Sequence, residues 1–295
     1  MKVVQPTHDS AVDAALFEQV IAFLLRDEAT NSLQLAGLWE HQAFQPDVLT
    51  LIAIDADEQV AGVAVQGGTF LMVLSAGMQE EAADAVLLHV FNRNIRVPGV
   101  MGPTATVEHL GQRWRRLSSG TLSPGMPQRI LQTSSVMAPT GIDGSARHFA
   151  ADDRGLLHEW FTWFALDAEG ARGEQAQRAA AAMITRIMAS GGGMFWLDDT
   201  GKPVSLACFK GRTPHGMRVG PVFTPKKYRR HGYGAAVTAA VTRHVLDQGL
   251  QFACLYTDAG NPTANHIYES IGYRFVADSM QYRFNWSTYD DDYDD

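Results

Sequence analysis

The spacing of apolar and polar positions along the chain predicts a mixed α/β protein. Apolar residues return every three or four positions, as in amphipathic helices, at 11–26, 79–92, 106–118, 152–166, 174–189, 235–248 and 262–271. Short apolar runs bounded by glycine, proline or acidic turns are typical of strands, and they occur at 49–54, 60–65, 69–75, 97–101, 129–137, 194–197, 204–210, 217–223, 251–257 and 273–284. Because helices and strands alternate, we expect sheets flanked by helices.

The order of these elements in the first half of the chain returns in the second half. The segment LIAIDADEQVAGVAVQG at 51–67 and the segment MFWLDDTGKPVSLACFKG at 194–211 each read as strand, acidic turn, strand and glycine. Each is followed by strand, helix, strand, helix and strand. The letters match poorly, and two α+β domains can share an order by chance, so duplication and coincidence both stay open.

The turn-rich run APTGIDGSA at 138–146 is the expected boundary between the two halves. We therefore place one domain at 1–140 and a second at 146–285. The remaining residues, 286–295, form an acidic tail that we expect to be disordered.

The stretch MRVGPVFTPKKYRRHGYGAA at 217–236 carries the strongest chemical signal. It reads as a strand, a turn with four cations, a pair of glycines and the start of a helix. Glycine lets the backbone come close to a ligand, and the first amides of a helix have no partner inside it. The helix dipole also favours an anion there. This combination predicts a site for a phosphate or a pyrophosphate, against the alternative of a glycine-bearing helix start beside a solvated basic turn.

Three phosphate-binding motifs can be compared with this loop. A P-loop requires Gly-x-x-x-x-Gly-Lys-Ser/Thr, which is not present here. A dinucleotide fingerprint requires a third glycine where this chain has Val237, and it directly follows its strand. The acyl-CoA pyrophosphate loop, Arg/Gln-x-x-Gly-x-Gly/Ala, is matched at every fixed position by Arg229 to Gly234.

A second motif lies about thirty residues further on. The segment NPTANHIYESIGY at 261–273 begins with a capping residue and a proline, and a glycine ends the helix. Asn261, Ala264, Asn265 and Tyr268 share one helix face. This is similar to the Asn-x-x-Ala-x-x-x-Tyr…Gly-Phe/Tyr signature of the GNAT superfamily of acetyltransferases. With the loop, it makes residues 146–284 resemble that superfamily directly, whereas the first half resembles it by pattern only.

The resemblance implies a fold and a co-substrate site. It implies two GNAT-like lobes, each a mixed, mostly antiparallel twisted sheet flanked by helices, as in other tandem GNAT proteins. It also implies that acetyl-CoA lies between strands 217–223 and 251–257. The residues implied to contact it are Val222, Phe223, Thr224, Arg229, Arg230, His231, Gly232, Tyr233, Gly234, Ala235 and Asn261.

Several of these residues have simpler explanations. Asn261 can act as a helix cap alone. Lys226 or Lys227 can reach the 3′-phosphate of the co-substrate or stay solvated. In the first half, Ala76 to Gln79 takes the place of the loop and keeps one glycine and no cation, so we expect that copy to hold no pyrophosphate.

Tyr268 matches the position of the general acid in GNAT enzymes, although a tyrosine on a helix is otherwise usually a packing residue. A phenol can protonate a leaving thiolate at neutral pH without being ionised itself. The strand before the loop has no carboxylate, so Asp258, His215 or a water-mediated route are candidates for removing the amine proton. Cys254 has no His/Asp partner spacing that supports a nucleophile.

Composition narrows the class of partner. The net charge of −8 disfavours general binding to nucleic acid or to an anionic membrane. Two cysteines give neither a disulfide framework nor a zinc spacing, so we expect free thiols, no metal and a cytoplasmic protein. No signal peptide and no apolar run of membrane-spanning length is visible.

The sequence therefore predicts an acetyl-CoA-dependent N-acetyltransferase acting directly on the primary amine of a small molecule, as a monomer or a homodimer. The first lobe is expected to be a degenerate copy that walls the acceptor site. Two alternatives stay open. One is a CoA-binding sensor or interaction module with little turnover, and the other is a peptide or protein lysine acetyltransferase.

Overall fold

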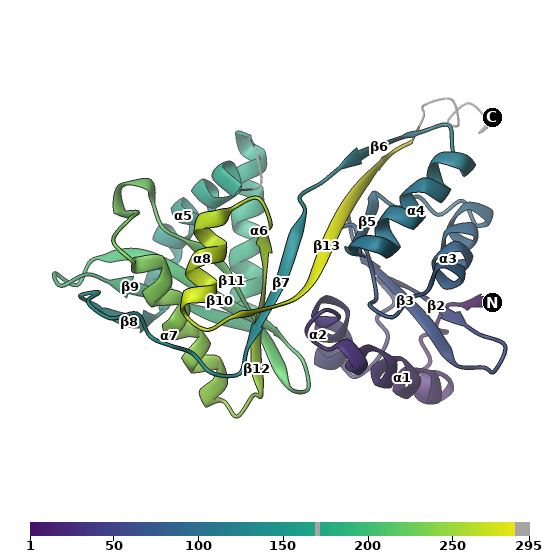
Figure 1. The fold of residues 1–295 in the computed structure, drawn as a ribbon, viewed down its shortest axis with the longest axis horizontal. Helices are drawn as coiled ribbons and strands as arrows, with labels where there is room; N and C mark the ends of the chain where they lie inside the picture. Colours follow the sequence, from purple (N-terminus) through teal and green to yellow (C-terminus); the bar gives the residue numbers. More distant parts are fainter. Residues whose placement is uncertain (169–171, 287–295) are drawn as a thin grey trace. The chain divides into compact units, whose positions relative to one another are not determined.

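A computed structural model describes residues 1–168 and 172–286 (Figure 1). The fold is mixed α/β, with mostly antiparallel twisted sheets flanked by helices, as expected. The chain divides into two compact units. Unit 1 comprises Met1–Ile130, Thr257–Gly260 and the chain from Val276 onward, and unit 2 comprises Leu131–Tyr256 and Asn261–Phe275.

Unit 1 is built on the strand order β1-β2-β3-β4-β5-β13, and β6 pairs with β13. The β4–β5 pair is parallel, whereas β1–β2, β2–β3, β3–β4, β5–β13 and β6–β13 are antiparallel. Its elements are β1 (Lys2–Val4), α1 (Ser10–Leu24), α2 (Ser32–His41), β2 (Val48–Ile54), β3 (Val60–Gly67), β4 (Met72–Leu74), α3 (Glu80–Asn92), β5 (Gly99–Pro103), α4 (Thr104–Leu117), β6 (Thr121–Pro124), the first half of β7 (Gln128–Thr133) and most of β13 (Arg274–Asn285).

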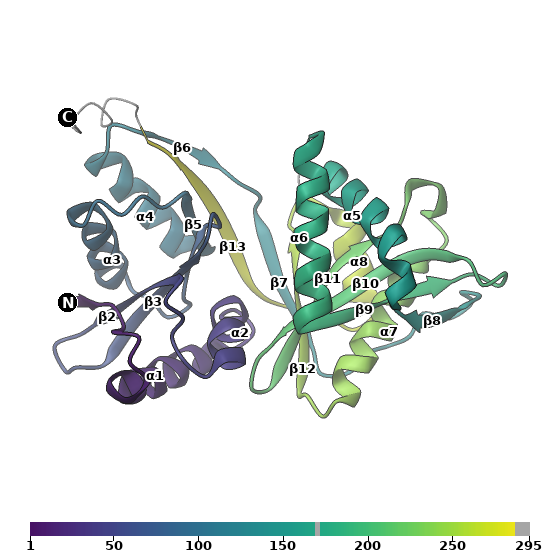
Figure 2. The same cartoon turned by 180° about the vertical axis from the view of Figure 1, so that it is seen from behind.

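Unit 2 follows the order β7-β12-β11-β10-β9-β8 (Figure 2). The β11–β12 pair is parallel, whereas β8 to β11 are antiparallel neighbours. Its elements are β8 (Ser145–His148), α5 (Arg154–Ala168), α6 (Glu174–Ser190), β9 (Gly191–Leu197), β10 (Pro203–Arg212), β11 (Gly216–Phe223), α7 (Tyr233–Asp247), β12 (Phe252–Asp258) and α8 (Pro262–Ser270).

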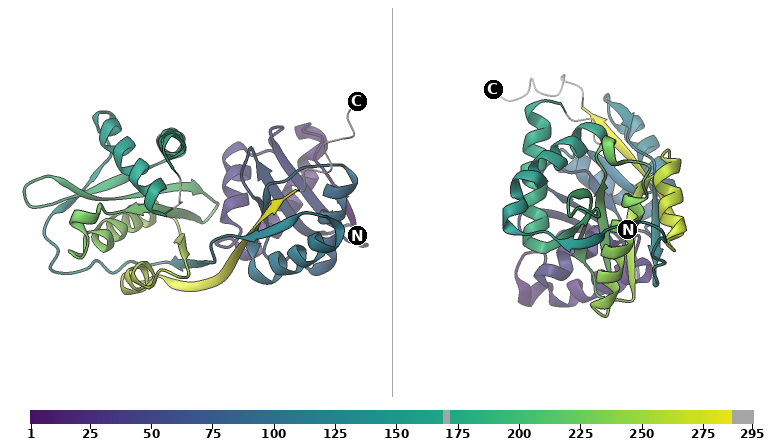
Figure 3. Two further views of the ribbon diagram at one scale, coloured as in Figure 1. Left: turned by 90° about the horizontal axis from the view of Figure 1, so that it is seen from above. Right: turned by 90° about the vertical axis from the view of Figure 1, so that its left-hand side faces the viewer.

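The sheet of unit 2 has helices on both faces (Figure 3). Helices α5 and α6 pack on one face around Trp160, Phe161 and Ile184. Helix α7 packs on the other with Val237, Val241 and Val245, which are all fully buried. These valines are spaced four residues apart, as the sequence pattern predicts, and burying each contributes about 1.5–3 kcal/mol.

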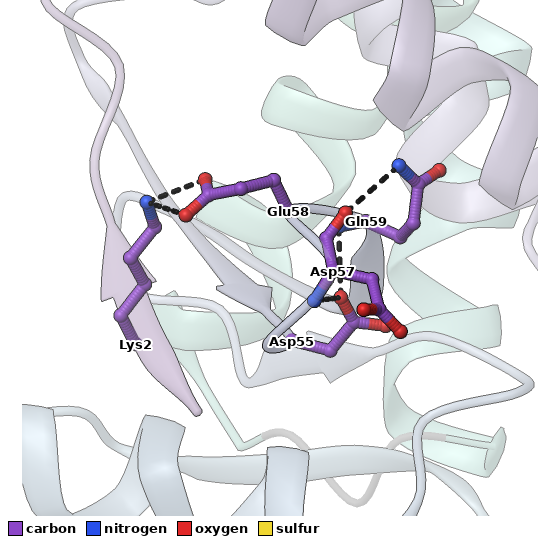
Figure 4. Close-up of polar contacts among 5 residues, drawn as sticks. All are labelled: Lys2, Asp55, Asp57, Glu58 and Gln59. Carbon is purple, nitrogen blue, oxygen red and sulfur yellow. Dashed lines mark hydrogen bonds and ion pairs between the residues drawn. The ribbon is translucent and has the colours of Figure 1, made fainter.

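The first hairpin of each unit is closed by the same turn, which supports duplication over chance. In unit 1 the Asp55 carboxylate accepts hydrogen bonds from the amides of Asp57 and Gln59, both at 2.9 Å (Figure 4). In unit 2 the Asp198 carboxylate accepts from the amides of Thr200 and Lys202, at 3.0 and 2.9 Å. Both turns therefore use an aspartate that bonds the second and fourth residues after it.

The fourth position of each turn has a positive φ: 59° at Glu58 and 82° at Gly201. Glycine adopts this backbone conformation without strain, whereas Glu58 does not. The side chain of Glu58 instead forms an exposed ion pair with Lys2, at 2.6 Å (Figure 4). The turn geometry is thus shared although the residues differ.

The structure adds elements that the sequence pattern did not predict. They include β1, α2 and β6, together with β8, which begins at Ser145 inside the expected boundary run. The compact units also divide the chain differently from the expected domains at 1–140 and 146–285. Most of β13 belongs to unit 1, where Ser279–Arg283 pair with β5. Residues 287–295 of the expected tail lie outside the described residues.

Candidate functional site

Strands β11 and β12 pair at one end and separate toward the other. Their parallel ladder runs from Gly216 opposite Phe252 to Arg218 opposite Cys254. Beyond that point β11 continues to Phe223 and β12 to Asp258 without pairing to each other in the described residues. An irregularity in the β10–β11 register between Val219 and Val222 accompanies the separation, and a bulge bends a strand in this way. The predicted co-substrate strands are therefore the two that separate.

The loop after β11 ends in an open helix start. Gly232 is the N-cap of α7, and no side chain caps it. Within the described residues, the structure contains no hydrogen bond from the backbone amides of Arg230 to Ala235, and the first bond of the helix runs from the Ala236 amide to the Gly232 carbonyl, at 3.0 Å. Free amides at a helix N-terminus are suited to binding an anion.

The two loop glycines are required for different reasons. Gly232 has a φ of 78°, and a Cβ there would collide with Cδ1 of Ile142. Gly234 is helical, and a Cβ there would lie 3.3 Å from the Thr224 hydroxyl oxygen, which is a tight contact. That hydroxyl already hydrogen-bonds Ser205 at 2.8 Å. Gly232 is thus the motif position where the left-handed backbone itself requires glycine.

The structure divides the four cations of the loop between different partners. Arg229 donates from Nε to the Thr224 carbonyl at 2.9 Å and from Nη2 to Asp167 of α5 at 3.0 Å. Lys226 pairs with the same carboxylate, at 3.2 Å. Partial burial raises the pKa of Asp167, but the bonds from Arg229 and Lys226 together outweigh it and hold the pKa below its ordinary value.

The other two cations have different surroundings. Nζ of Lys227 lies 4.9 Å from the centre of the Tyr228 ring. Arg230 is exposed, has a φ of 68°, and has no acidic partner among the described residues. His231 stacks on Tyr233 with ring centres 5.5 Å apart. Neither Lys227 nor Arg230 pairs with an acid in the described residues, so these two cations are left available to an anion, whereas Arg229 serves to hold the loop.

Asn261 caps helix α8. Its side-chain oxygen accepts a hydrogen bond from the Ala264 amide at 3.1 Å, and Pro262 takes the first helical position. Capping therefore accounts for this asparagine, and its expected contact with the co-substrate stays a prediction.

Tyr268 lies further along α8 and is half-buried. It packs against the same apolar cluster as Val222 of β11, Ala235 of α7 and Leu255 of β12. Desolvation raises the pKa of Tyr268 to about 12. Its hydroxyl has no hydrogen-bond partner among the described residues, so this proton is available for donation.

Tyr273, five residues later, shows the contrasting environment. Its ring is fully buried and its hydroxyl hydrogen-bonds the hydroxyl of Thr242 at 2.8 Å. Because Thr242 donates its own proton to the Thr238 carbonyl, at 2.8 Å, Tyr273 must be the donor of the pair. Tyr273 is thus a structural tyrosine, and Tyr268 is the one with a free hydroxyl.

The candidates for a general base are less well placed. Asp258 closes a turn at the end of β12, where it accepts from the Gly260 amide at 2.8 Å, and it belongs to unit 1. His215 is exposed and precedes β11, so about 25 Å of strand separates it from the loop. Cys254 is buried and is not part of a disulfide. Asp258 stays a prediction, and His215 lies at the wrong end of its strand for this role.

The corresponding place in unit 1 is filled by side chains. Met78 is buried in the core, and a Cβ at Gly77 would touch the Phe23 ring at 3.5 Å. The Ala76 amide is occupied by the side chain of Asn31, at 2.8 Å. Helix α3 then begins with two acids, Glu80 and Glu81, which repel an anion. These contacts support the expectation that unit 1 holds no pyrophosphate.

Two residues that contact the loop, Asp167 and Ile142, carry no signal in the sequence. Asp167 is one of many acids and lies 62 residues before Arg229. Ile142 lies in the turn-rich run that was expected to be only a boundary. A sequence pattern reports burial and turns, but it does not report which distant residues meet.

Within residues 1–168 and 172–286, no cluster of three or more histidine, cysteine, aspartate or glutamate side chains has the arrangement of a metal site. In the same residues, no helix has both the length and the apolar character needed to cross a membrane.

Residues 201–283 match a protein-family model described as FR47-like protein. A comparison with curated proteins found no match. Among solved structures, a GCN5-related N-acetyltransferase from Sphaerobacter thermophilus is similar with a TM-score of 0.62 at 15% identity, over 95% of this chain and 94% of that chain. A GNAT-family acetyltransferase from Colwellia psychrerythraea has a TM-score of 0.52 at 14% identity, over 97% and 100% of the two chains.

A tandem GNAT protein from the clavulanic acid biosynthesis pathway is also similar, with a TM-score of 0.58 at 11% identity, over 96% of this chain and 97% of that chain. At such identities a likeness establishes the fold and not the substrate. The match to nearly whole chains, one of them a tandem protein, agrees with the repeated order of elements described above. The chain thus has the fold of the GNAT acetyltransferases, and its residues 201–283 match the FR47-like family.

Proposed function

We propose that this protein is an acetyl-CoA-dependent N-acetyltransferase that acts on the primary amine of a small molecule. One observation carries the proposal. Two strands separate next to a helix start whose amides have no hydrogen-bond acceptor within the described residues. Tyr268, whose hydroxyl has no partner among those residues, packs against the apolar cluster that contains Ala235 of this helix and Leu255 of β12.

The residues present fit a pyrophosphate-bearing thioester. The amides from Arg230 to Ala235 supply donors, and Arg230 supplies a positive charge without an acidic partner among the described residues. Val222 and Phe223, at the end of β11, have no partner strand on the β12 side and can offer backbone groups to a pantetheine arm. Acetyl-CoA would bring the activated acetyl group.

The chain's own part in the chemistry is to position groups and to move protons. In the transfer, a carbon–nitrogen bond forms, the carbon–sulfur bond breaks, the amine loses a proton and the sulfur gains one. Tyr268 holds a proton at Oη and stays neutral far above physiological pH. Asp258, directly or through water, is the candidate that takes up the amine proton.

A binding protein with little turnover is the second candidate. The lack of a carboxylate on β11 favours it, because the strand offers no obvious base for the amine. A protein lysine as acceptor is the third. The amine that accepts the acetyl group is to be identified by assay.

The test measures thiol release from acetyl-CoA with a panel of an amino sugar, a polyamine, an amino acid and a lysine peptide. We expect one of the small amines to give turnover that depends on Tyr268. Tight CoA binding without turnover on any amine would favour the sensor, and turnover on the peptide alone would replace the proposed acceptor. Failure to bind CoA at 1 mM, on the order of the weakest useful affinity, would remove the assignment.

A further inference from the structure

The loop between β11 and α7, residues 224–232, has a backbone conformation that its own residues do not favour. Arg230 and Gly232 have φ angles of 68° and 78°, so two of three consecutive residues are left-handed. Only glycine adopts this conformation at no steric cost. A strained loop keeps its shape when its surroundings hold it, and such strain gathers at ligand sites.

One contact that holds the loop comes from helix α5. The carboxylate of Asp167 binds Arg229 and Lys226 together, and Arg229 is also bonded to the Thr224 carbonyl at the end of β11. Asp167 lies in the last turn of α5, where the helix dipole disfavours an acid. The two cations compensate for that position, so the carboxylate and the loop stabilise each other.

The second contact comes from the segment before β8. The side chain of Ile142 lies against the Cα of Gly232. Its neighbour Asp143 is fixed, because the Asp143 carbonyl accepts a hydrogen bond from the Trp196 indole at 3.0 Å. Strand β8 then pairs with β9 from Ser145 opposite Leu197 onward. Ile142 is therefore presented to the loop from an anchored segment.

We propose that Asp167 and Ile142 are positioning residues for the co-substrate: they hold the strained loop in the shape in which its free amides can bind a diphosphate. This inference rests on the proposed function for the identity of the ligand, but the rigidity of the loop can be measured without it. If the loop keeps the competent shape only part of the time, the apparent Kd rises by the inverse of that fraction. A loop that is competent about 10–30% of the time would bind roughly three- to tenfold more weakly.

The sign of the effect separates positioning from simple charge. Asp167→Asn removes a negative charge beside a site for a polyanion, so electrostatics alone would tighten CoA binding. Positioning predicts the opposite, a loss of about three- to tenfold. Glu159→Gln is the matched control, because Glu159 is an exposed acid on the same helix. Asp167→Glu restores the carboxylate and should recover part of the affinity.

Ile142→Ala removes the contact with Gly232 without changing any charge, and Ile142→Val keeps most of it. We expect the alanine variant to weaken CoA binding by a similar factor and the valine variant to stay near wild type. For both positions the KM for acetyl-CoA should rise while kcat at saturation stays unchanged. A general loss of folded protein would instead lower the apparent kcat and leave the KM unchanged.

Limited digestion with trypsin tests the loop itself, in the protein without ligand. The loop carries Lys226, Lys227, Arg229 and Arg230, and neither Asp167→Asn nor Ile142→Ala changes these cleavage sites. Cleavage within a folded protein follows the population of the open state. We expect cleavage in the loop to be several times faster in both variants than in wild type or Glu159→Gln.

The outcomes separate the two proposals. If wild type does not bind CoA but the variants are cleaved faster than wild type, the proposed function is removed, whereas the role of Asp167 and Ile142 in holding the loop stands. Normal CoA binding by wild type, with unchanged or tighter binding and unchanged cleavage in Asp167→Asn and Ile142→Ala, would overturn the positioning role alone.

Discussion

Replacing Tyr268 by phenylalanine separates catalysis from stability. The substitution removes one hydroxyl group and keeps the ring, which packs against the apolar cluster of unit 2 and lies 6.1 Å from the Tyr273 ring. Because that hydroxyl has no hydrogen-bond partner among the described residues, its loss leaves no buried group unsatisfied. We therefore expect a change in the free energy of unfolding of no more than about 0.5 kcal/mol.

The effect on the rate should be large. A positioned general acid contributes roughly 10²- to 10⁴-fold, so Tyr268→Phe should lower kcat by at least about a hundredfold. The KM for acetyl-CoA should change little, since the hydroxyl acts on the leaving sulfur during the reaction. Single-turnover measurements with the best amine of the panel avoid a limit set by product release.

Tyr273→Phe is the matched control, because it also removes one tyrosine hydroxyl from the same region. Here the lost group donates to Thr242 inside the core, so unfolding should become easier by about 1–2 kcal/mol. For a protein of this size that lowers the Tm by roughly 2–8 °C. Its kcat should stay within about threefold of wild type.

The reasoning fails if Tyr268→Phe keeps more than about a third of the wild-type single-turnover rate. It also fails if the two variants show the same pattern, with rate and Tm falling together. In that case Tyr268 would be a packing residue like its neighbour, and another group would have to supply the proton.

Three further predictions follow from the same geometry. Gly232→Ala places a Cβ where the backbone is left-handed, which costs about 1–2 kcal/mol, so CoA binding measured by calorimetry should weaken roughly 5- to 30-fold. Gly234→Ala, at a helical position where the motif accepts alanine, should bind within about threefold of wild type, and equal binding by the two variants would contradict this reasoning. Phe284→Ala removes a ring that stacks on buried Trp114 with ring centres 4.7 Å apart, so the free energy of unfolding of unit 1, measured by denaturant titration, should fall by about 3–5 kcal/mol. A fall of less than about 1 kcal/mol, as for a surface substitution, would count against that packing. Burial raises the pKa of Tyr268 to about 12, whereas an unfolded tyrosine ionises near pH 10, so this tyrosine destabilises the fold as pH rises from about 10 to about 12. Tyr268→Phe cannot ionise and should lose less stability than wild type over that range, and identical alkaline unfolding curves would argue against a raised pKa.

The comparison between the two units also shows which local features they share. The aspartate turn at 55–59 and the one at 198–202 have the same hydrogen bonds although only the aspartate is shared. The helix start that follows β4 in unit 1 and β11 in unit 2 differs between them. In unit 1 it is filled by Met78 and Phe23, and in unit 2 it is left open at Gly232. The shared scaffold thus shows in the local turn chemistry, whereas the site depends on which side chains fill a helix start.

Much of the fold could be predicted from the sequence because its signals are local. Periodicity reports which side of a helix or strand is buried, so α7 and its three valines were predictable. The loop at 229–234 and the helix at 262–270 were predictable as well, because free amides, left-handed glycine and an asparagine cap are properties of a few consecutive residues.

Only the tertiary structure decided which distant residues meet. It determined that β11 and β12 stop pairing after Arg218, that Asp167 and Ile142 reach the loop, and that most of β13 completes the sheet of unit 1. It also showed that the Tyr273 hydroxyl is bonded to Thr242 in the core, whereas the Tyr268 hydroxyl has no partner among the described residues. The physical reason is that a hydrogen bond, a strand pairing or a steric contact depends on the position of both partners, and a local pattern carries information about only one of them.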